Sequence, residues 1–161
     1  MISCLQGAKT LVQLADAEGR GLTNLQVQKI LYFANMLFIG RSGPDNPLIE
    51  DKFLTWVYGP AVDLLYERIK RYGKDSVKRE AFDDIIPIMN EDTQEPEEGY
   101  KTHVEVLKDA YKRWGKFDSY KLVGISHWRK GAWKKSVDSE EKEISNILIK
   151  EEFDARYSHE G

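Results

Sequence analysis

One helical stretch, residues 22–38, limits the possible folds of this chain more than any other segment. Its apolar side chains recur at helical spacing and cover a wide arc instead of a narrow stripe. They are Val27, Ile30, Leu31, Ala34, Leu37 and Phe38. Thr23 followed by Gln26 fits a capping box, in which two side chains satisfy backbone amides of the first turn. A helix that is apolar on most sides must be surrounded by other elements, so we expect it to be central.

Other segments supply elements that can surround this helix. Periodic apolar residues predict further helices over residues 3–17, 60–73, 104–114, 119–126 and 139–153. Pro60 suits the first turn of the second of these, and Gly73 its end. Ser139 is the expected cap of the last helix, whose buried stripe is Ile144, Ile147, Leu148 and Phe153. Residues 53–58 are aromatic and β-branched, which favours a short strand.

The expected fold class is therefore mainly α: a single compact domain, residues 1–161, of about six helices with a small accessory β-strand pair. Residues 91–99 hold five acids, one proline and no base, which predicts an acidic surface loop. Residues 154–161 are expected to form a frayed tail. A chain of this length can bury a core without disulfides or metals.

Charge and cysteine content exclude several classes of protein. The 24 basic and 27 acidic residues give a net charge of −3, so nucleic acid is not expected as the main partner. Cys4 is the only cysteine, and it can form no internal disulfide, which favours a reducing, cytoplasmic location. No apolar run approaches the length of a membrane span, and the N-terminus does not resemble a signal peptide. His103, His127 and His159 have no metal-ligand spacing, so we expect neither a metal nor a cofactor.

Polar residues on the central helix form the first candidate site. Asn24, Gln28 and Tyr32 step by four and make a straight polar ridge, with Lys29 beside it. Polar groups on a strongly apolar helix need partners. The ridge is either an internal hydrogen-bond network or a face that binds another protein, and the sequence leaves both open.

A second candidate site is the turn that contains Trp56, Tyr58, Gly59 and Pro60. As a structural turn, it uses the glycine for unusual backbone angles, the proline to begin the next helix, and the two aromatics as anchors. As a recognition surface, it would present Trp56 and Tyr58 to a partner, because aromatic residues are frequent binding anchors.

The third candidate site is His127 with the basic, aromatic run that follows it. Beside Trp128 and Trp133, the histidine is either packed and hydrogen-bonded or functional. Ser126 precedes it, but a neighbour in sequence does not establish the geometry of a nucleophile. The run, with Arg129 and Lys130, is a solvated loop, a grip for an acidic protein surface, or a platform for nucleic acid. No phosphate-binding loop, dinucleotide fingerprint or hydrolase motif is present.

Three segments in this order and spacing resemble the Panacea domain, a family that includes SocA-like antitoxins and phage-associated GepA-like proteins. They are LTNLQVQKILYFA (residues 22–34), WVYGPAV (residues 56–62) and LVGISH (residues 122–127) followed by Trp133. The resemblance covers roughly residues 3–153. The third segment departs from the family pattern at Ser126 and Ala132, where the pattern has threonine and proline.

The resemblance implies an antitoxin of a prophage-associated toxin–antitoxin system, a protein without enzymatic activity or cofactor that neutralises a cognate toxin by direct contact. The alternatives are an adaptor that delivers a client to a protease, which would add a protease or chaperone as partner, an enzyme that depends on His127, and a nucleic-acid-binding repressor. The candidate partner-binding residues are Asn24, Gln28, Lys29, Tyr32, Trp56, Tyr58, His127, Trp128, Arg129, Lys130 and Trp133, with Gly59 and Pro60 shaping the turn.

Overall fold

The structure, a computed structural model, describes residues 1–158. Within them, the α-helices are α1 (Cys4–Ala17), α2 (Asn24–Ser42), α3 (Asp63–Ile69), α4 (Lys101–Trp114), α5 (Ser119–Ser126), α6 (Ala132–Asp138) and α7 (Asn146–Tyr157). Two short 3-10 helices, η1 (Lys70–Tyr72) and η2 (Arg79–Phe82), follow α3. The strands β1 (Leu54–Trp56) and β2 (Gly59–Ala61) form an antiparallel hairpin in which Trp56 pairs with Gly59. The prediction of a mainly helical fold with one small strand pair is confirmed.

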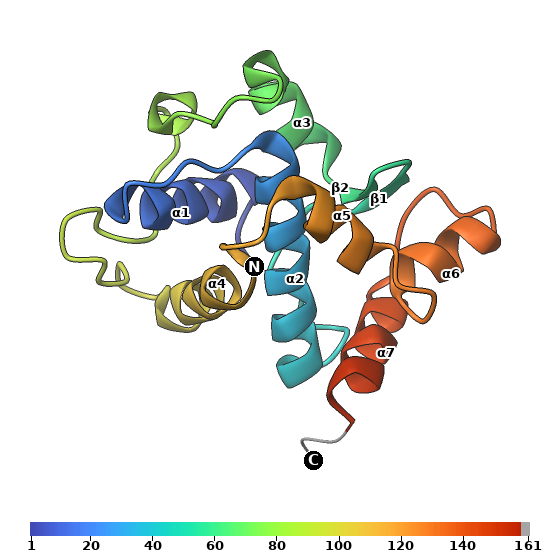
Figure 1. Ribbon diagram of the computed structural model, residues 1–161. Coiled ribbons are helices and arrows are strands. Elements are labelled where there is room, and N and C mark those ends of the chain that lie inside the picture. The colour runs from blue at the N-terminus through green and yellow to red at the C-terminus, as the bar shows by residue number, and fades with distance from the viewer. Residues whose placement is uncertain (159–161) are drawn as a thin grey trace.

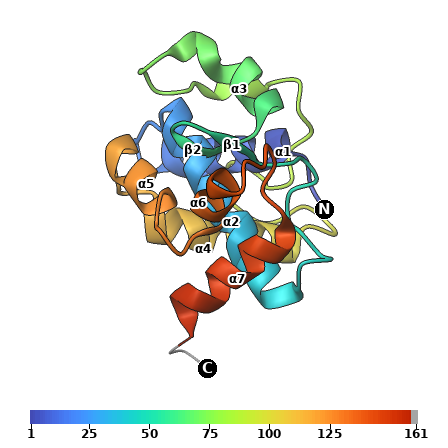
Figure 2. The same cartoon turned by 90° about the vertical axis from the view of Figure 1, so that its right-hand side faces the viewer.

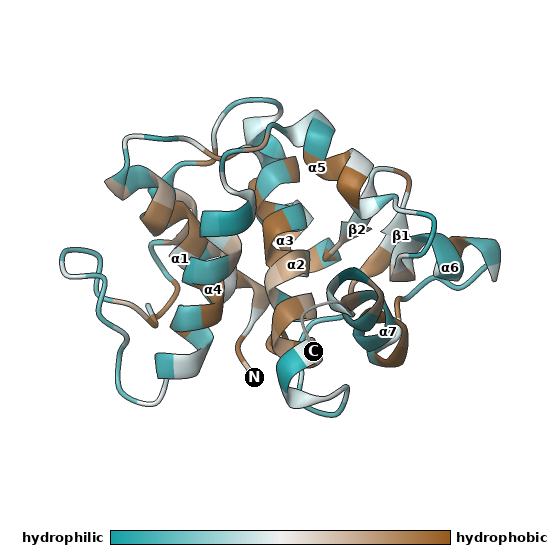
Figure 3. Ribbon diagram, turned by 60° about the horizontal axis from the view of Figure 1, so that its bottom comes forward, coloured by the Kyte–Doolittle hydropathy of each residue, from teal (hydrophilic) through white to brown (hydrophobic). Residues whose placement is uncertain are grey.

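Helix α2 runs through the middle of the molecule and is covered on most sides (Figure 1). It packs against α1, α4, α5 and α7, and also against α3 and β2. Every residue from Val27 to Leu37 is buried, as the wide apolar arc predicts. The capping box forms: Thr23 Oγ1 accepts the Gln26 N–H at 3.2 Å, and the Thr23 N–H donates to Gln26 Oε1 at 2.8 Å. Hydrophobic residues of the surrounding helices gather toward α2, whereas the outer loops are mainly hydrophilic (Figure 3).

The C-terminal third of the chain differs from the prediction. A helix that the sequence pattern did not indicate, α6, occupies residues 132–138, and α7 begins at Asn146 instead of after Ser139. No side chain near Gly131 caps α6 locally; the first amide, that of Ala132, donates instead to Glu152 in α7 at 3.0 Å. A cap that comes from 20 residues away leaves no local sequence signal. Ser145 is the side chain that caps α7, through the Leu148 N–H.

Two details of the apolar and terminal residues are also corrected. Ile147, expected in the buried stripe of α7, is exposed, because α7 turns Ile149 and Glu152 toward the core instead. The tail is helical as far as Tyr157, since Phe153 and Tyr157 pack against the core. The remainder of the predicted tail, residues 159–161 with His159, lies outside the described residues.

Pro60 lies in β2, not in the first turn of a helix. Helix α3 begins only at Asp63, because Pro60 pairs with Thr55 in the hairpin and Val62 is the extended N-cap. The Val62 carbonyl accepts the Tyr66 N–H of α3 at 3.0 Å, and its amide is bound by the Gln28 side chain of α2. Gly73 ends the helical segment with φ +57°, at the position predicted. Residues 91–99 form a largely exposed loop without a regular helix or strand, as their acidic composition predicts.

Candidate partner-binding groove

The tip of the β1–β2 hairpin presents two apolar side chains to solvent. The chain reverses through Val57 and Tyr58, which are 76% and 63% exposed. Gly59 follows with φ +104°, a conformation that favours glycine. A Cβ at this position would lie 2.3 Å from Ser126 Oγ and 3.0 Å from Lys29 Cε. Gly59 therefore supplies the unusual backbone angles expected of a structural turn. Its lack of a side chain also lets the hairpin pack directly on α2 and α5.

Two polar side chains of α2 hydrogen-bond the backbone of β2 and the residue after it. Gln28 Nε2 donates to the Val62 carbonyl at 3.1 Å, and Gln28 Oε1 accepts the Val62 N–H at 2.9 Å. Lys29 Nζ donates to the Pro60 carbonyl at 2.9 Å. Both side chains are buried, where backbone polar groups require such partners. For Gln28 and Lys29, the structure favours the internal network over the partner-binding face.

Lys29 is an unusual member of this network. Its side chain is 1% exposed, and within residues 1–158 its ammonium group forms no ion pair with a carboxylate. Burial lowers the pKa of Lys29 from 10.5 to about 7. Lys29 is therefore not a solvated surface lysine, because the hairpin covers its side chain.

Tyr32 belongs to a second buried network, which holds α7 against α2. Its hydroxyl donates to Glu152 Oε1 at 2.6 Å, and the other Glu152 oxygen pairs with Arg156 at 2.7 Å. Burial, followed by the negative charge of Glu152 and the hydrogen bond to it, raises the pKa of Tyr32 well above its ordinary value, so the hydroxyl remains a donor. Asn24 is buried as well, and its Oδ1 has no hydrogen-bond partner among the described residues. All three residues of the ridge, and Lys29 beside it, are thus buried in this structure.

Aromatic residues from the second and third candidate sites come together beside the hairpin, which contacts α5 through β2 and α6 through β1 (Figure 2). Trp133 Nε1 donates to the Trp56 carbonyl at 2.8 Å. The Trp133 ring stacks on His127 with centroids 4.0 Å apart and an angle of 7° between the planes. Trp56 meets Tyr66 edge-on at 5.1 Å. This cluster joins the hairpin to the start of α6, and it supports the packed interpretation of His127.

His127 is half-buried and does not form a nucleophile–base pair with its neighbour. Burial, and then the positive charge of Lys29, lowers the pKa of His127, against a smaller opposing effect of the Val57 backbone. Its Nε2 atom is buried without a hydrogen-bond partner in the described part of the chain. Ser126 Oγ donates to the Val123 carbonyl at 2.7 Å, so its hydroxyl hydrogen is not directed at the imidazole.

The basic run after His127 is only partly accessible. Trp128 is half-buried, and the Arg156 guanidinium covers its ring at 4.6 Å from the centroid. Arg129 and Lys130 are exposed. Of the three residues, the two cations are the ones available to a partner.

An open groove of about 720 Å³ lies between the hairpin tip, α5 and the start of α2. Its lining is mainly apolar and comprises Thr23, Leu25, Val57, Tyr58, Gly73, Lys74, Ser119, Tyr120, Val123 and His127. Tyr120 is 91% exposed. Tyr58 and His127 are the two predicted site residues that line this groove, and the arrangement is typical of a surface that binds another molecule.

Sequence reasoning missed the other principal groove residues. It also missed the buried network of Tyr32, Glu152 and Arg156 that holds α7 against α2, called the buried clamp below. Tyr120 and Val123 lie on a short helix whose periodicity predicts a helix but does not indicate which side stays uncovered. Glu152 and Arg156 are four residues apart, a spacing that could have suggested an ion pair. Nothing in the acidic composition of that segment indicates that Glu152 is buried.

The described residues contain neither a cluster of metal ligands nor a helix that could span a membrane. Among residues 1–158, no group of three or more histidine, cysteine, aspartate or glutamate side chains is placed to hold a metal ion. Within the same residues, the helices are too short or too polar to span a lipid bilayer.

Comparison with known proteins identifies the family. Residues 27–134, which are 108 of the 161 residues, match the family described as "Antitoxin SocA-like, Panacea domain". The chain belongs to this family. Its matched region contains most of α2, the hairpin, α5 and the groove residues except Thr23 and Leu25. The family pattern quoted from the sequence thus coincides with the elements that build the groove.

One relative of known name supports this assignment. The antitoxin SocA of Caulobacter vibrioides (strain NA1000 / CB15N) is 28% identical to this Panacea chain over 127 residues. The aligned region covers 78% of this chain and 65% of that protein, so it spans slightly less than two thirds of the relative's length. No solved structure matches the chain.

Proposed function

We propose that this Panacea protein is an antitoxin that neutralises a cognate toxin by direct protein–protein contact. The observation that carries the proposal is the family match over residues 27–134, in which antitoxin is the described role. The relative with a known name is also an antitoxin. The proposal assigns the protein a binding role, and the Ser126 hydroxyl, which donates to the Val123 carbonyl and not to His127, is compatible with it.

The surface of the protein is consistent with a binding role. Large apolar side chains at Val57, Tyr58 and Tyr120 remain exposed around one concave region. Aromatic residues of this kind commonly provide the main contacts of protein interfaces.

The test is growth of cells in which the gene adjacent to this one is induced, with and without the chain. The expected result is growth arrest by the neighbour alone, rescue by the chain, and a complex of the two proteins that co-purifies in equal amounts. A harmless neighbour, or rescue without a complex, would overturn the proposal.

The same cells separate neutralisation by contact from the alternative mechanisms. If the chain blocks the toxin by occupying it, the toxin's half-life stays unchanged or lengthens when the chain is present. Faster decay that requires a protease would instead assign an adaptor role. Loss of rescue by a folded His127→Asn variant that still binds the toxin would assign an enzymatic role.

A further inference from the structure

The groove beside the hairpin carries an asymmetric distribution of charge. No carboxylate is among its lining residues, and Lys74 lies at the end formed by the segment after η1. Within residues 1–158, Lys74 forms no ion pair at 4 Å or less, unlike several of its neighbours in sequence. The paired neighbours are Arg68 with Asp84 at 2.6 Å, Lys70 with Glu67 at 2.6 Å, and Arg79 with Asp16 and Glu91 at 3.6 and 3.3 Å.

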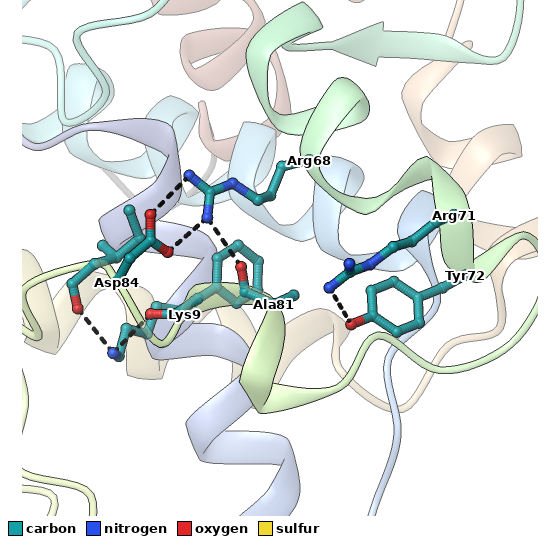
Figure 4. Close-up of polar contacts among 8 residues, drawn as sticks. Lys9, Arg68, Arg71, Tyr72, Ala81 and Asp84 are labelled. Carbon is teal, nitrogen blue, oxygen red and sulfur yellow. Dashed lines mark hydrogen bonds and ion pairs between the residues drawn. The ribbon is translucent and has the colours of Figure 1, made fainter.

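A second hollow is lined by residues on both sides of Gly73 and Lys74 in the sequence, and it adds two cations. It is lined by Arg71, Tyr72, Asp75, Ser76, Lys78 and Glu80. The Arg71 guanidinium donates to the Tyr72 hydroxyl at 3.1 Å and pairs with no carboxylate in the described residues, whereas Arg68 beside it is neutralised by Asp84 (Figure 4). Together with Lys74, the unpaired Arg71 and Lys78 exceed the two acids of the hollow.

We propose that the groove binds an apolar segment of the cognate toxin that carries acidic residues at the end nearest Lys74. This inference rests on the proposed antitoxin function. The apolar side chains of the segment would contact Val57, Tyr58 and Tyr120, and its acidic residues would lie near Lys74 and Arg71. Apolar contacts supply most of the affinity in such an interface, while complementary charge speeds encounter and sets orientation.

The charge distribution favours a toxin segment over a second copy of this chain. In a two-fold symmetric dimer through the groove, the same patch faces itself. Because no carboxylate lines the groove, the groove of a second copy would offer no negative group to Lys74. An acidic partner segment would supply that group.

The test compares groove variants with matched control variants of the full chain, using the product of the adjacent gene as the binding probe. Tyr120→Glu and Val57→Glu place a charge in the groove. Ile86→Glu and Ile147→Glu place the same charge at exposed apolar positions outside it, with 78% and 65% exposure. All four side chains are exposed, so melting temperatures should match the wild type, and circular dichroism checks this.

The expected result is a loss of at least about 30-fold in affinity for both groove variants and a change of less than about 3-fold for both controls. Lys74→Glu should slow association, and the effect should shrink as salt is raised, because exposed charges are screened. Lys112→Glu, at an exposed position on α4, should leave the association rate unchanged.

Three results would overturn the proposal in distinguishable ways. If the wild-type chain does not bind or neutralise the neighbour's product, the proposed function fails and the groove assignment fails with it. If the wild type binds but Tyr120→Glu behaves like Ile86→Glu, only the groove assignment fails. If Tyr120→Glu converts a dimer to a monomer in sedimentation experiments and leaves toxin binding intact, the groove binds a second copy instead.

Discussion

Replacement of Lys29 by methionine should change how the stability of this protein depends on pH. Lys29 is buried beneath the hairpin and pairs with no carboxylate among residues 1–158. Its pKa is lowered by burial from 10.5 to about 7. The folded protein therefore releases a proton that the unfolded chain keeps, and unfolding takes up a proton at any pH between these two values. Because of this uptake, the free energy of unfolding rises with pH in that window.

The magnitude follows from the two pKa values of Lys29. This one proton lowers the stability of the wild type by about 4 kcal/mol at pH 7 and by about 2 kcal/mol at pH 9. This destabilisation is largest below pH 7 and disappears above pH 10.5. Methionine has a similar length but cannot donate to the Pro60 carbonyl, which costs about 1–3 kcal/mol at every pH. The Lys29→Met variant should thus be more stable than the wild type at neutral pH and lose this advantage in alkaline solution.

Urea unfolding followed by circular dichroism at pH 7, 8 and 9 measures the effect. The difference in free energy of unfolding between Lys29→Met and the wild type should fall by about 2 kcal/mol from pH 7 to pH 9. Other titrating groups are common to both proteins and cancel in the difference. His127, whose pKa the Lys29 charge lowers, titrates below this range. Lys112→Met, at an exposed position, should show no such trend, and a pH-independent difference for Lys29→Met would refute the argument.

The remaining predictions concern the buried clamp and the hairpin turn. Glu152→Gln should lower the free energy of unfolding by about 3 kcal/mol, because it breaks a buried ion pair with Arg156. The control Glu151→Gln, at an exposed ion pair, should change it by less than about 1 kcal/mol. Equal effects of the two variants in urea unfolding would contradict the clamp. Gly59→Ala should lower the free energy of unfolding by about 1–3 kcal/mol more than Gly43→Ala. Both glycines have positive φ, but only at Gly59 would a Cβ meet neighbouring atoms, and matching thermal melts would contradict this close packing.

Local patterns of the sequence predict most of the helices and the central position of α2. The capping box at Thr23 and the wide apolar arc from Val27 onward depend on residues within a few positions of each other, so the sequence alone indicates them. Helix α6 escaped prediction because its cap, Glu152, is distant in sequence. Pro60 was misplaced because it pairs with Thr55 in the hairpin, which packs on α2, and that pairing depends on tertiary contacts.

The candidate site divides in the same way. The family resemblance and the residue types at Trp56, Tyr58 and His127 are visible in the sequence, and two of these residues do line the groove. Burial is not visible there, because an exposed and a buried polar residue have the same identity. Packing of the hairpin against α2 buries Lys29, and packing of α7 against α2 buries Tyr32 with Glu152, while Tyr120 is left uncovered. Which polar residues bond internally and which apolar residues remain available to a partner therefore depends on contacts between distant segments, and only the tertiary structure defines those contacts.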